Sequence, residues 1–560
     1  MTPQTTASEP ERILVIGLDG ASFDILDPLM AAGRLPVLAE LAARGTTAVL
    51  ESPVPPMSPI AWPAFYTGVG PGKHGVFGFS EFIPATHQEV LVSSRSVRVV
   101  PFWQHLGRRG KRTLVMNVPM TFPPAPLEGA MVTGVLTPHS DSECTYPEGL
   151  REELQRAVGP LVPDPTVRTL RRAEPTAVLE RLQESVDLRA GVALHLMGEQ
   201  PWDLCITVFY TTDVVQHALL GDAVPGPGAV AELVGDAGHI VQEHYRQVDE
   251  AVGRLLECAG DDTTVLVMSD HGVTVKRRWL YVNEWLAERG LLTWSRWAAG
   301  GSHQFAMRRK TLGRALSGLR LSGLARLLPR RWLDAQVPLP RWSQLRLSRP
   351  GIDWRRTRAF VPPSMRDGIR INLKGRERHG TVAPGEEYEA LRAEIAEGLL
   401  TLTDPETDAP VFDRVCRREE LYAGDHVELA PDLVLASRGQ QVRPTWGSNR
   451  GRLFKPAEGA DGAEHTCDGV LMAAGPGIAP SSERHEAAIV DLAPTILYLL
   501  GAAIPEYVDG QVRTELLDPE LTATRPAAYA AAPGAQSGGG APADAPDERV
   551  LRRLRDLGYL

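Results

Sequence analysis

Three carboxylates follow short apolar segments of the chain. Asp19 is near the end of RILVIGLDG, Asp213 ends DLCITVFYTTD, and Asp270 comes shortly after TTVLVM. In α/β sheets, ligands collect at the carboxyl ends of the strands, so we expect these side chains to gather at one sheet edge. A single Asp in such a place is usually a turn former or a helix cap, but three together indicate a shared site.

Two of these carboxylates have a histidine close by in the sequence. Asp213 and His217 stand four positions apart, so a helix would place both side chains on one face. Asp270 and His271 are adjacent and can converge only from an irregular turn, which Gly272 permits. A carboxylate beside an imidazole suits zinc, manganese or iron better than calcium, which prefers oxygen ligands. These pairs predict a metal site.

A site with two imidazoles, a carboxylate and an open position needs one more histidine. His465, in GAEHTCDGVLMAAGPGI, is the best candidate because an apolar strand with a small-residue turn follows it. A histidine in such a place is more often a hydrogen-bonded core residue, and that alternative stays open. Other histidines lie in polar or helical segments without partners, namely His87, His105, His239, His303, His379 and His485.

Ser58 is the candidate nucleophile. It lies in the proline-rich segment PVPPMSPIAWPAFYTGVGPGKHG, in front of a predicted helix whose first position is Pro59. A serine there is also a good N-cap for the helix. The two roles are compatible, because a helix N-terminus carries free N–H groups and partial positive charge that favour an approaching phosphate.

The elements that must position these residues indicate an α/β fold. Apolar, β-branched runs at 12–20, 113–119, 203–213 and 263–272 predict strands, and a helical pattern over 241–256 separates the last two. This alternation predicts a largely parallel central sheet. The strand pattern resumes at GIRINLK, PDLVLAS and GVLMAAGPGI, and a helix is expected to begin at Asp491 and end at Gly501.

Changes in composition divide the chain into segments. The expected segments are a disordered N-terminus (1–11), the first part of a catalytic domain (12–274), an inserted cap (275–440), the second part of the catalytic domain with His465 (441–521), an Ala/Pro/Gly/Ser linker (522–547) and a short terminal helix (548–560). Within the cap, 308–358 is rich in Lys and Arg. We expect a helix with a solvated basic face there, and a lid that attracts anionic substrates or a lipid-binding surface are the alternatives.

Composition and charge exclude several classes of protein. With 560 residues, 43% of them hydrophobic, the chain can bury a large core. Its net charge of −10 argues against binding to nucleic acid polymers. Five widely spaced cysteines without a CxxC pair argue against a disulfide framework and a thiolate zinc site. The first residues lack the pattern of a secretory signal, and prolines interrupt the uncharged stretch 52–72, so we expect a cytoplasmic protein without a transmembrane segment.

Several motifs, taken in chain order, resemble a known family. LDGAS, PPMSPIAWPAFYTGVGPGKHG, TTDVVQH, MSDHG, the His465 segment and VDLAPTILYLLG are together similar to the alkaline phosphatase superfamily, specifically to its type I phosphodiesterase and nucleotide pyrophosphatase branch. The resemblance spans residues 12–515 and is loose over 275–440. It implies an alkaline phosphatase-like three-layer α/β/α sandwich with an inserted cap region.

The resemblance also implies a set of site residues. Two divalent metal ions are expected, most simply zinc, with manganese or iron as alternatives. Ser58 stands where the family places its nucleophile, between the metals, while His74 in PGKHG is interpreted as structural. Asn117, in MNVPMTFPP, is a candidate donor to a phosphoryl oxygen, although an Asn at a strand end is more often a turn residue. The implied ligands are Asp19, Asp270 and His271 for one metal, and Asp213, His217 and His465 for the other.

The predicted function is two-metal hydrolysis of a small-molecule phosphodiester or nucleotide pyrophosphate through a phosphoseryl intermediate on Ser58. A phosphomonoesterase and a non-catalytic descendant that acts as a binding module are the alternatives. A sulfatase is disfavoured because SPIAW lacks the arginine of the C/S-x-P-x-R pattern. The nucleophile motif and larger ligand set of a cofactor-independent phosphoglycerate mutase are not apparent either.

Overall fold

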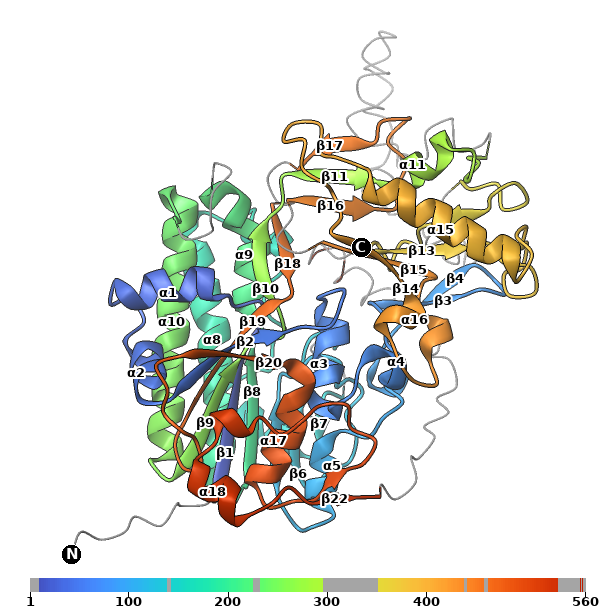
Figure 1. Ribbon diagram of the computed structural model, residues 1–560. Coiled ribbons are helices and arrows are strands. Elements are labelled where there is room, and N and C mark those ends of the chain that lie inside the picture. The colour runs from blue at the N-terminus through green and yellow to red at the C-terminus, as the bar shows by residue number, and fades with distance from the viewer. Residues whose placement is uncertain are drawn as a thin grey trace, which may run out of the picture.

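A nine-stranded sheet runs through the larger body of the protein (Figure 1). The computed structural model describes residues 10–137, 143–224, 232–295, 351–437, 441–457 and 462–531, together with Leu554 and Asp556. The order of the strands is β20-β2-β19-β9-β1-β8-β5-β6-β7. They are β1 (Arg12–Leu18), β2 (Thr46–Glu51), β5 (Thr113–Met116), β6 (Gly129–Val132), β7 (Thr145–Tyr146), β8 (Leu204–Phe209), β9 (Thr263–Met268), β19 (Asp468–Ala474) and β20 (Arg484–Ala488).

The central strands of this sheet are parallel. β1 pairs in parallel with β8 and β9, and β5 does so with β6 and β8. Only β19 and β7 run antiparallel to their neighbours in the sheet. Every residue of β8 and β9 is buried, which explains why these strands appear in the sequence as unbroken apolar runs rather than as alternating ones. The prediction of a largely parallel α/β sheet is confirmed.

Helices cover both faces of the sheet and complete the predicted three-layer sandwich (Figure 1). Helices α2, α8 and α10 pack together on one side, and α17 packs against α3 and α5 on the other. Their bounds are α2 (Pro36–Arg44), α3 (Ser58–Thr67), α5 (Phe102–Gly107), α8 (Pro175–Glu199), α10 (Gly235–Ala259) and α17 (Leu492–Leu499). The remaining helices of this body are α1 (Phe23–Ala31), α4 (Pro71–His74), α6 (Leu150–Ala157), α7 (Val167–Leu170), α9 (Thr211–Ala223) and α18 (Pro519–Thr524).

A smaller lobe has its own hydrophobic core and two small sheets (Figure 1). One sheet has the order β16-β11-β17 and the other β12-β13-β15-β14. The strands are β11 (Arg278–Tyr281), β12 (Ala359–Phe360), β13 (Gly368–Ile371), β14 (Arg414–Arg417), β15 (Leu433–Ala436), β16 (Val442–Thr445) and β17 (Phe454–Pro456). The helices are α11 (Val282–Glu288), α15 (Glu386–Leu400), α16 (Arg418–Leu421) and the short 3-10 helix η3 (Val427–Leu429).

The lobe takes in residues from outside the 275–440 segment. Strands β16 and β17 follow it in the chain, and Phe82 of the β3 (Ser80–Ile83) and β4 (Gln88–Leu91) hairpin belongs to the lobe core. GIRINLK and PDLVLAS form β13 and β15, which lie in this lobe and not in the central sheet. A local strand pattern indicates a strand but carries no information about the sheet that it joins. The antiparallel pair β10 (Gly272–Val275) and β18 (Ala463–Thr466) links the two bodies.

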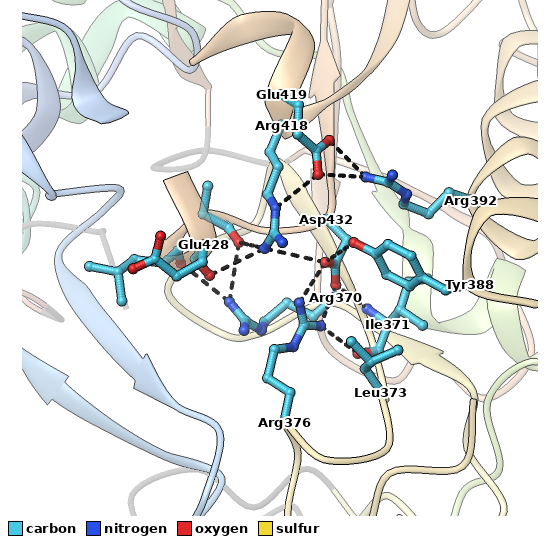
Figure 2. Close-up of polar contacts among 12 residues, drawn as sticks. Arg370, Ile371, Leu373, Arg376, Tyr388, Arg392, Arg418, Glu419, Glu428 and Asp432 are labelled. Atoms are coloured by element: carbon cyan, nitrogen blue, oxygen red, sulfur yellow. Dashed lines mark hydrogen bonds and ion pairs between the residues drawn. The ribbon is translucent and has the colours of Figure 1, made fainter. Parts of the chain in front are cut away.

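A buried polar network organises the lobe around Asp432, which is fully buried (Figure 2). Arg376 donates two hydrogen bonds to the Asp432 carboxylate, at 2.6 and 2.7 Å, and the Tyr388 hydroxyl donates another at 2.6 Å. Burial alone would raise the pKa of Asp432, but the hydrogen bonds and charge of Arg376 outweigh it and lower the pKa to about 2. The network therefore ties β15 to β13 and α15 through one ionised carboxylate.

Some predicted segments fall partly or wholly outside the described residues. Of the segment 1–11 only residues 10 and 11 are described, and of the basic segment 308–358 only 351–358. In the expected linker, 522–531 includes the end of α18 and strand β22 (Tyr529–Ala530), which pairs with β21 (Ile504–Pro505). In the expected terminal helix, Leu554 and Asp556 are helical, and Leu554 is buried in the main core. No helix within the described ranges is long and apolar enough to cross a membrane.

Candidate active site

The structure brings together all seven residues that the sequence motifs single out. Six of them have at most about one twentieth of their surface exposed, and the His217 side chain is 15% exposed. They lie at the carboxyl ends of the central strands, where α/β sheets place their ligands. Asp19 follows β1, Ser58 begins α3, Asp213 and His217 lie on α9 after β8, Asp270 and His271 follow β9, and His465 lies on β18.

The first set of possible ligands consists of Asp19, Asp270 and His271. The Nε2 atom of His271 lies 3.3 Å from Asp270 Oδ2 and 3.7 Å from Asp19 Oδ1. The backbone N–H of Gly20 donates to Asp270 Oδ1 at 3.2 Å, and the Trp62 indole donates to Asp19 Oδ2 at 2.9 Å. The three side chains are close enough together to share one cation. As expected, Asp270 and His271 converge from an irregular turn after β9.

The second set consists of Asp213, His217 and His465. Asp213 and His217 face one another across one turn of α9, with 3.3 Å between Oδ1 and Nε2. The Nε2 atom of His465 lies 3.4 Å from Asp213 Oδ1 and 2.8 Å from His217 Nε2. The His271 ring stacks on the His465 ring with 3.6 Å between centroids, so the two sets are immediate neighbours.

Backbone carbonyls fix the tautomers of two histidines. Nδ1 of His271 lies 3.1 Å from the Gly272 carbonyl oxygen, and Nδ1 of His465 lies 2.9 Å from that of Pro56. A carbonyl oxygen only accepts, so each Nδ1 donates, and Nε2 of each ring faces the site. Within the described part of the chain, no hydrogen-bond donor reaches Asp270 Oδ2. The site therefore turns carboxylate oxygens and imidazole nitrogens toward one another, an arrangement that fits divalent cations.

The pKa shifts of the site residues also favour a bound cation. Burial raises the pKa of Asp19 well above its ordinary value, and the nearby carboxylates of Asp270 and Asp213 raise it further. Burial raises the pKa of Asp270 as well and lowers that of His271 to about 4, so His271 is neutral at pH 7. Burial also opposes ionisation of Asp213, but His217 and His465 outweigh it and hold its pKa well below the ordinary value. A bound cation would relieve the repulsion among these carboxylates.

Ser58 faces the first set of ligands. Its hydroxyl donates to Asp19 Oδ1 at 3.4 Å and lies 3.2 Å from His271 Nε2. The interpretation of Ser58 as a helix N-cap is wrong, because the cap position is Met57 and Ser58 is the first helical residue. Met57 is extended, so the helix begins one residue earlier than expected and the serine side chain reaches the sheet edge instead of the helix N–H groups.

Asn117 and His74 have contacts outside the two sets. Asn117 has a φ of +59° and its amide donates to the Val208 carbonyl at 2.7 Å, which favours the turn interpretation over a phosphoryl contact. His74 is fully buried, and its Nδ1 accepts from the Val76 N–H at 3.2 Å. Burial lowers the pKa of His74 to about 3.

Two contributors to the site were missing from the sequence interpretation. Trp62, whose indole holds Asp19, lies one helical turn after Ser58, and this spacing is the signal that would have indicated it. The Pro56 carbonyl, which orients His465, had no signal in the sequence because every residue carries a carbonyl group.

Comparison with known proteins identifies the family of the chain and supports its fold. The sequence model of the type I phosphodiesterase / nucleotide pyrophosphatase family matches residues 13–452. The chain belongs to this family, within the alkaline phosphatase superfamily. Membership supports the hydrolysis of phosphoesters as the class of its reaction. No curated protein matches the chain in sequence.

Two solved structures are similar to this chain over most of its length, at low sequence identity. Phosphonoacetate hydrolase from Sinorhizobium meliloti 1021, in complex with phosphonoformate, is 16% identical, with a TM-score of 0.53 over 89% of this chain and 97% of its own. Murine ectonucleotide pyrophosphatase / phosphodiesterase 5 is 12% identical, with a TM-score of 0.47 over 90% of this chain and 100% of its own. The first likeness confirms the alkaline phosphatase-like fold.

Proposed function

We propose that the protein is a two-metal phosphohydrolase that cleaves small-molecule phosphodiesters or nucleotide pyrophosphates through a phosphoseryl intermediate on Ser58. The observation that carries this proposal is the position of the Ser58 hydroxyl, within 3.4 Å of Asp19 and 3.2 Å of His271. A serine hydroxyl is a weak nucleophile by itself, and a metal centre is one of the ways in which enzymes activate it.

The two sets of ligands correspond to two metal positions. Asp19, Asp270 and His271 would hold one ion, and Asp213, His217 and His465 the other. Bound ions supply Lewis-acid chemistry, which lowers the pKa of the serine hydroxyl and neutralises charge on the phosphoryl oxygens. The mixture of carboxylate and imidazole ligands suits zinc, with manganese or iron as alternatives.

The side chains of the protein define the course of the reaction. Ser58 Oγ forms a bond to phosphorus while the bond from phosphorus to the leaving oxygen breaks on the opposite side. The Ser58 hydroxyl gives up its proton to solvent as this bond forms, and the leaving group, an alcohol from a diester or a phosphate from a pyrophosphate, takes up a proton from solvent if it needs one. Water then attacks the phosphoserine, the bond from Oγ to phosphorus breaks, the phosphate monoester is released, and a proton from the water restores the Ser58 hydroxyl. The first turn of α3 adds partial positive charge next to the phosphoryl oxygens.

His217 marks the side from which substrate enters. Its side chain is 15% exposed, whereas Asp213 and His465 beside it are 2% and 5% exposed. The buried first set contacts the Ser58 hydroxyl through Asp19 and His271.

The test compares metal content with turnover. We would purify the protein, measure bound zinc, manganese and iron, and assay bis(4-nitrophenyl) phosphate against 4-nitrophenyl phosphate. Ser58→Ala is expected to retain the metals and lose turnover by several orders of magnitude. Ser52→Ala is the matched control, because Ser52 is a buried serine of the same loop outside both sets. Normal turnover in Ser58→Ala would rule out Ser58 as the nucleophile.

The other outcomes separate the alternatives. Preferential cleavage of the monoester would make the protein a phosphomonoesterase. A protein that binds no metal and stays inactive after zinc or manganese is added would be a non-catalytic descendant that serves as a binding module.

We also propose a cytoplasmic location. All five cysteines are free thiols, and four of them are buried. Free thiols persist most readily in a reducing compartment.

A further inference from the structure

We propose that Gln216 is a positioning residue that fixes the distance between the two sets of ligands. The inference rests on the proposed two-metal function. Gln216 is fully buried on α9, between Asp213 and His217, and is not itself in either set. Its side-chain amide contacts the turn that carries Asp19.

The two sets belong to separate elements, so something has to hold them in register. Asp19, Asp270 and His271 follow strands β1 and β9, which are neighbours in the central sheet. Asp213 and His217 belong to helix α9, a separate element that follows β8. Two-metal phosphoryl transfer requires ions about 3.5–4 Å apart. The contact between α9 and the turn after β1 therefore determines whether that spacing is reached.

Two side chains of α9 clamp this turn. The Thr212 hydroxyl donates to the Asp19 carbonyl at 2.6 Å, and Gln216 Nε2 donates to the Gly20 carbonyl at 3.1 Å. Thr212 and Gln216 are one helical turn apart, and each immediately precedes a ligand of the second set. One face of α9 is thus fastened to the turn, and the adjacent face presents Asp213 and His217.

Gly20 connects the clamp to both sets. Its N–H donates to Asp270 Oδ1 at 3.2 Å, while its carbonyl accepts from Gln216. A Cβ atom at this position would lie 3.1 Å from Asp213 Oδ1 and 3.4 Å from His271 Cε1, so the residue lies directly between the sets. The peptide groups around Gly20 therefore link Asp270 of the first set to the helix that carries the second.

An uncharged amide is the group that this position requires. Gln216 Nε2 is also within hydrogen-bond distance of the Thr212 carbonyl, at 2.9 Å, and of the Tyr245 hydroxyl, at 3.0 Å. A carboxylate would repel both carbonyls and add negative charge beside Asp213. A methionine would fill the same space without donating a hydrogen bond. Gln216→Met should therefore release the clamp and leave packing nearly intact.

The experiment measures metal binding in the full-length protein. Wild type, Gln216→Met and Thr212→Val would be titrated with Zn²⁺, and their Mn²⁺ forms would be examined by electron paramagnetic resonance for a spin-coupled pair. We expect wild type to bind two ions with a coupled spectrum. Both variants should bind the second ion at least about tenfold more weakly, with loss of coupling, while the first ion stays bound. Turnover should fall in parallel.

The control is Gln247→Met on α10. Gln247 is another buried glutamine whose amide donates to a backbone carbonyl, that of Leu179, at 3.4 Å, and it should keep both ions. Two ions bound with wild-type affinity and coupling in Gln216→Met and in Thr212→Val would overturn the clamp and leave the proposed function standing. A wild-type protein that binds neither Zn²⁺ nor Mn²⁺ would overturn both. If Gln216→Met does not fold, Thr212→Val decides the question because it preserves side-chain volume.

Discussion

Several side chains of this site have little freedom, because groups outside the two sets also contact them. The Gly272 and Pro56 carbonyls orient two imidazoles, and the Trp62 indole orients Asp19. In metal sites, groups that hold the ligands in this way usually affect metal affinity and activity nearly as much as the ligands themselves. Two predictions test how much the site depends on its surroundings.

The first prediction concerns Gly20, where only a residue without a side chain fits. Gly20 and Gly33 share a φ of +69°, but a Cβ at Gly20 would meet Asp213 Oδ1 at 3.1 Å, whereas one at Gly33 would meet nothing within 4 Å. Alanine should cost about 1 kcal/mol of stability at either position, because both are left-handed. Only Gly20→Ala should also weaken zinc binding and turnover, by about tenfold or more. Comparable losses in Gly33→Ala would show that backbone strain is the cause.

The second prediction concerns the indole of Trp62. Trp62→Phe removes the 2.9 Å hydrogen bond to Asp19 Oδ2 and leaves that oxygen buried without its donor. Stability should fall by about 1–3 kcal/mol, and turnover should fall with it because Asp19 loses its orientation. Trp103→Phe, at another buried tryptophan of the same body, should lose stability alone. Equal turnover in the two variants, measured at saturating zinc, would show that the hydrogen bond from Trp62 to Asp19 does not contribute to catalysis.

At the scale of elements, prediction from the sequence succeeded where the information is local. Strands β1, β5, β8 and β9 were all anticipated from their apolar runs, and the spacing of Asp213 and His217 correctly placed them on one helix face. It failed where long-range contacts decide the outcome. Strands β13 and β15 join a separate sheet, although their apolar runs look like those of the central strands. The charged residues within these segments, Arg370 and Asp432, belong to the buried network of the lobe, and the prediction from the apolar patterns took no account of them.

The loop before α3 is an element whose position depends on the lobe. Tyr422, just after α16, donates from its hydroxyl to the Val54 carbonyl at 2.6 Å. The same loop supplies the Pro56 carbonyl that orients His465 and ends at Ser58. This hydrogen bond from Tyr422 therefore joins the lobe to the loop that leads to Ser58.

The third prediction tests this link. Tyr422→Phe removes one hydrogen bond worth about 1 kcal/mol, so turnover should fall roughly fivefold while the protein stays folded. Tyr388→Phe is the matched control, because its hydroxyl also donates at 2.6 Å, but to Asp432 inside the lobe. That variant should lose stability and keep its turnover. A fall in turnover that merely tracks the loss of stability in both variants would contradict the link.

At the scale of the whole molecule, the site lies where the two bodies meet. Pro55 and Met57, from the loop that leads to Ser58, line one small cavity together with Met365 and Asp367 of the lobe. The chain enters the lobe after β10 and returns through β18, which carries His465. Separation of the bodies would thus displace a ligand of the second set. Sequence motifs indicated the candidate ligands, but only the tertiary structure shows that His465 lies on the strand by which the chain leaves the lobe.

Buried histidines should make the whole molecule sensitive to acid. His74 and His244 are fully buried, and burial lowers their pKa values from 6.5 to about 3 and about 4. In the unfolded chain these histidines therefore bind protons below pH 6.5, whereas in the folded chain they stay neutral until about pH 4. The free energy of unfolding consequently falls as pH falls through this window. Each histidine contributes a slope of up to about 1.4 kcal/mol per pH unit.

The fourth prediction tests this pH dependence by urea unfolding between pH 7 and pH 4.5. His244→Gln should lower the slope of the unfolding free energy against pH by up to that amount. His239→Gln, at an exposed position of the same helix, should leave the slope unchanged. An unchanged slope in His244→Gln would mean that this histidine is already protonated when folded.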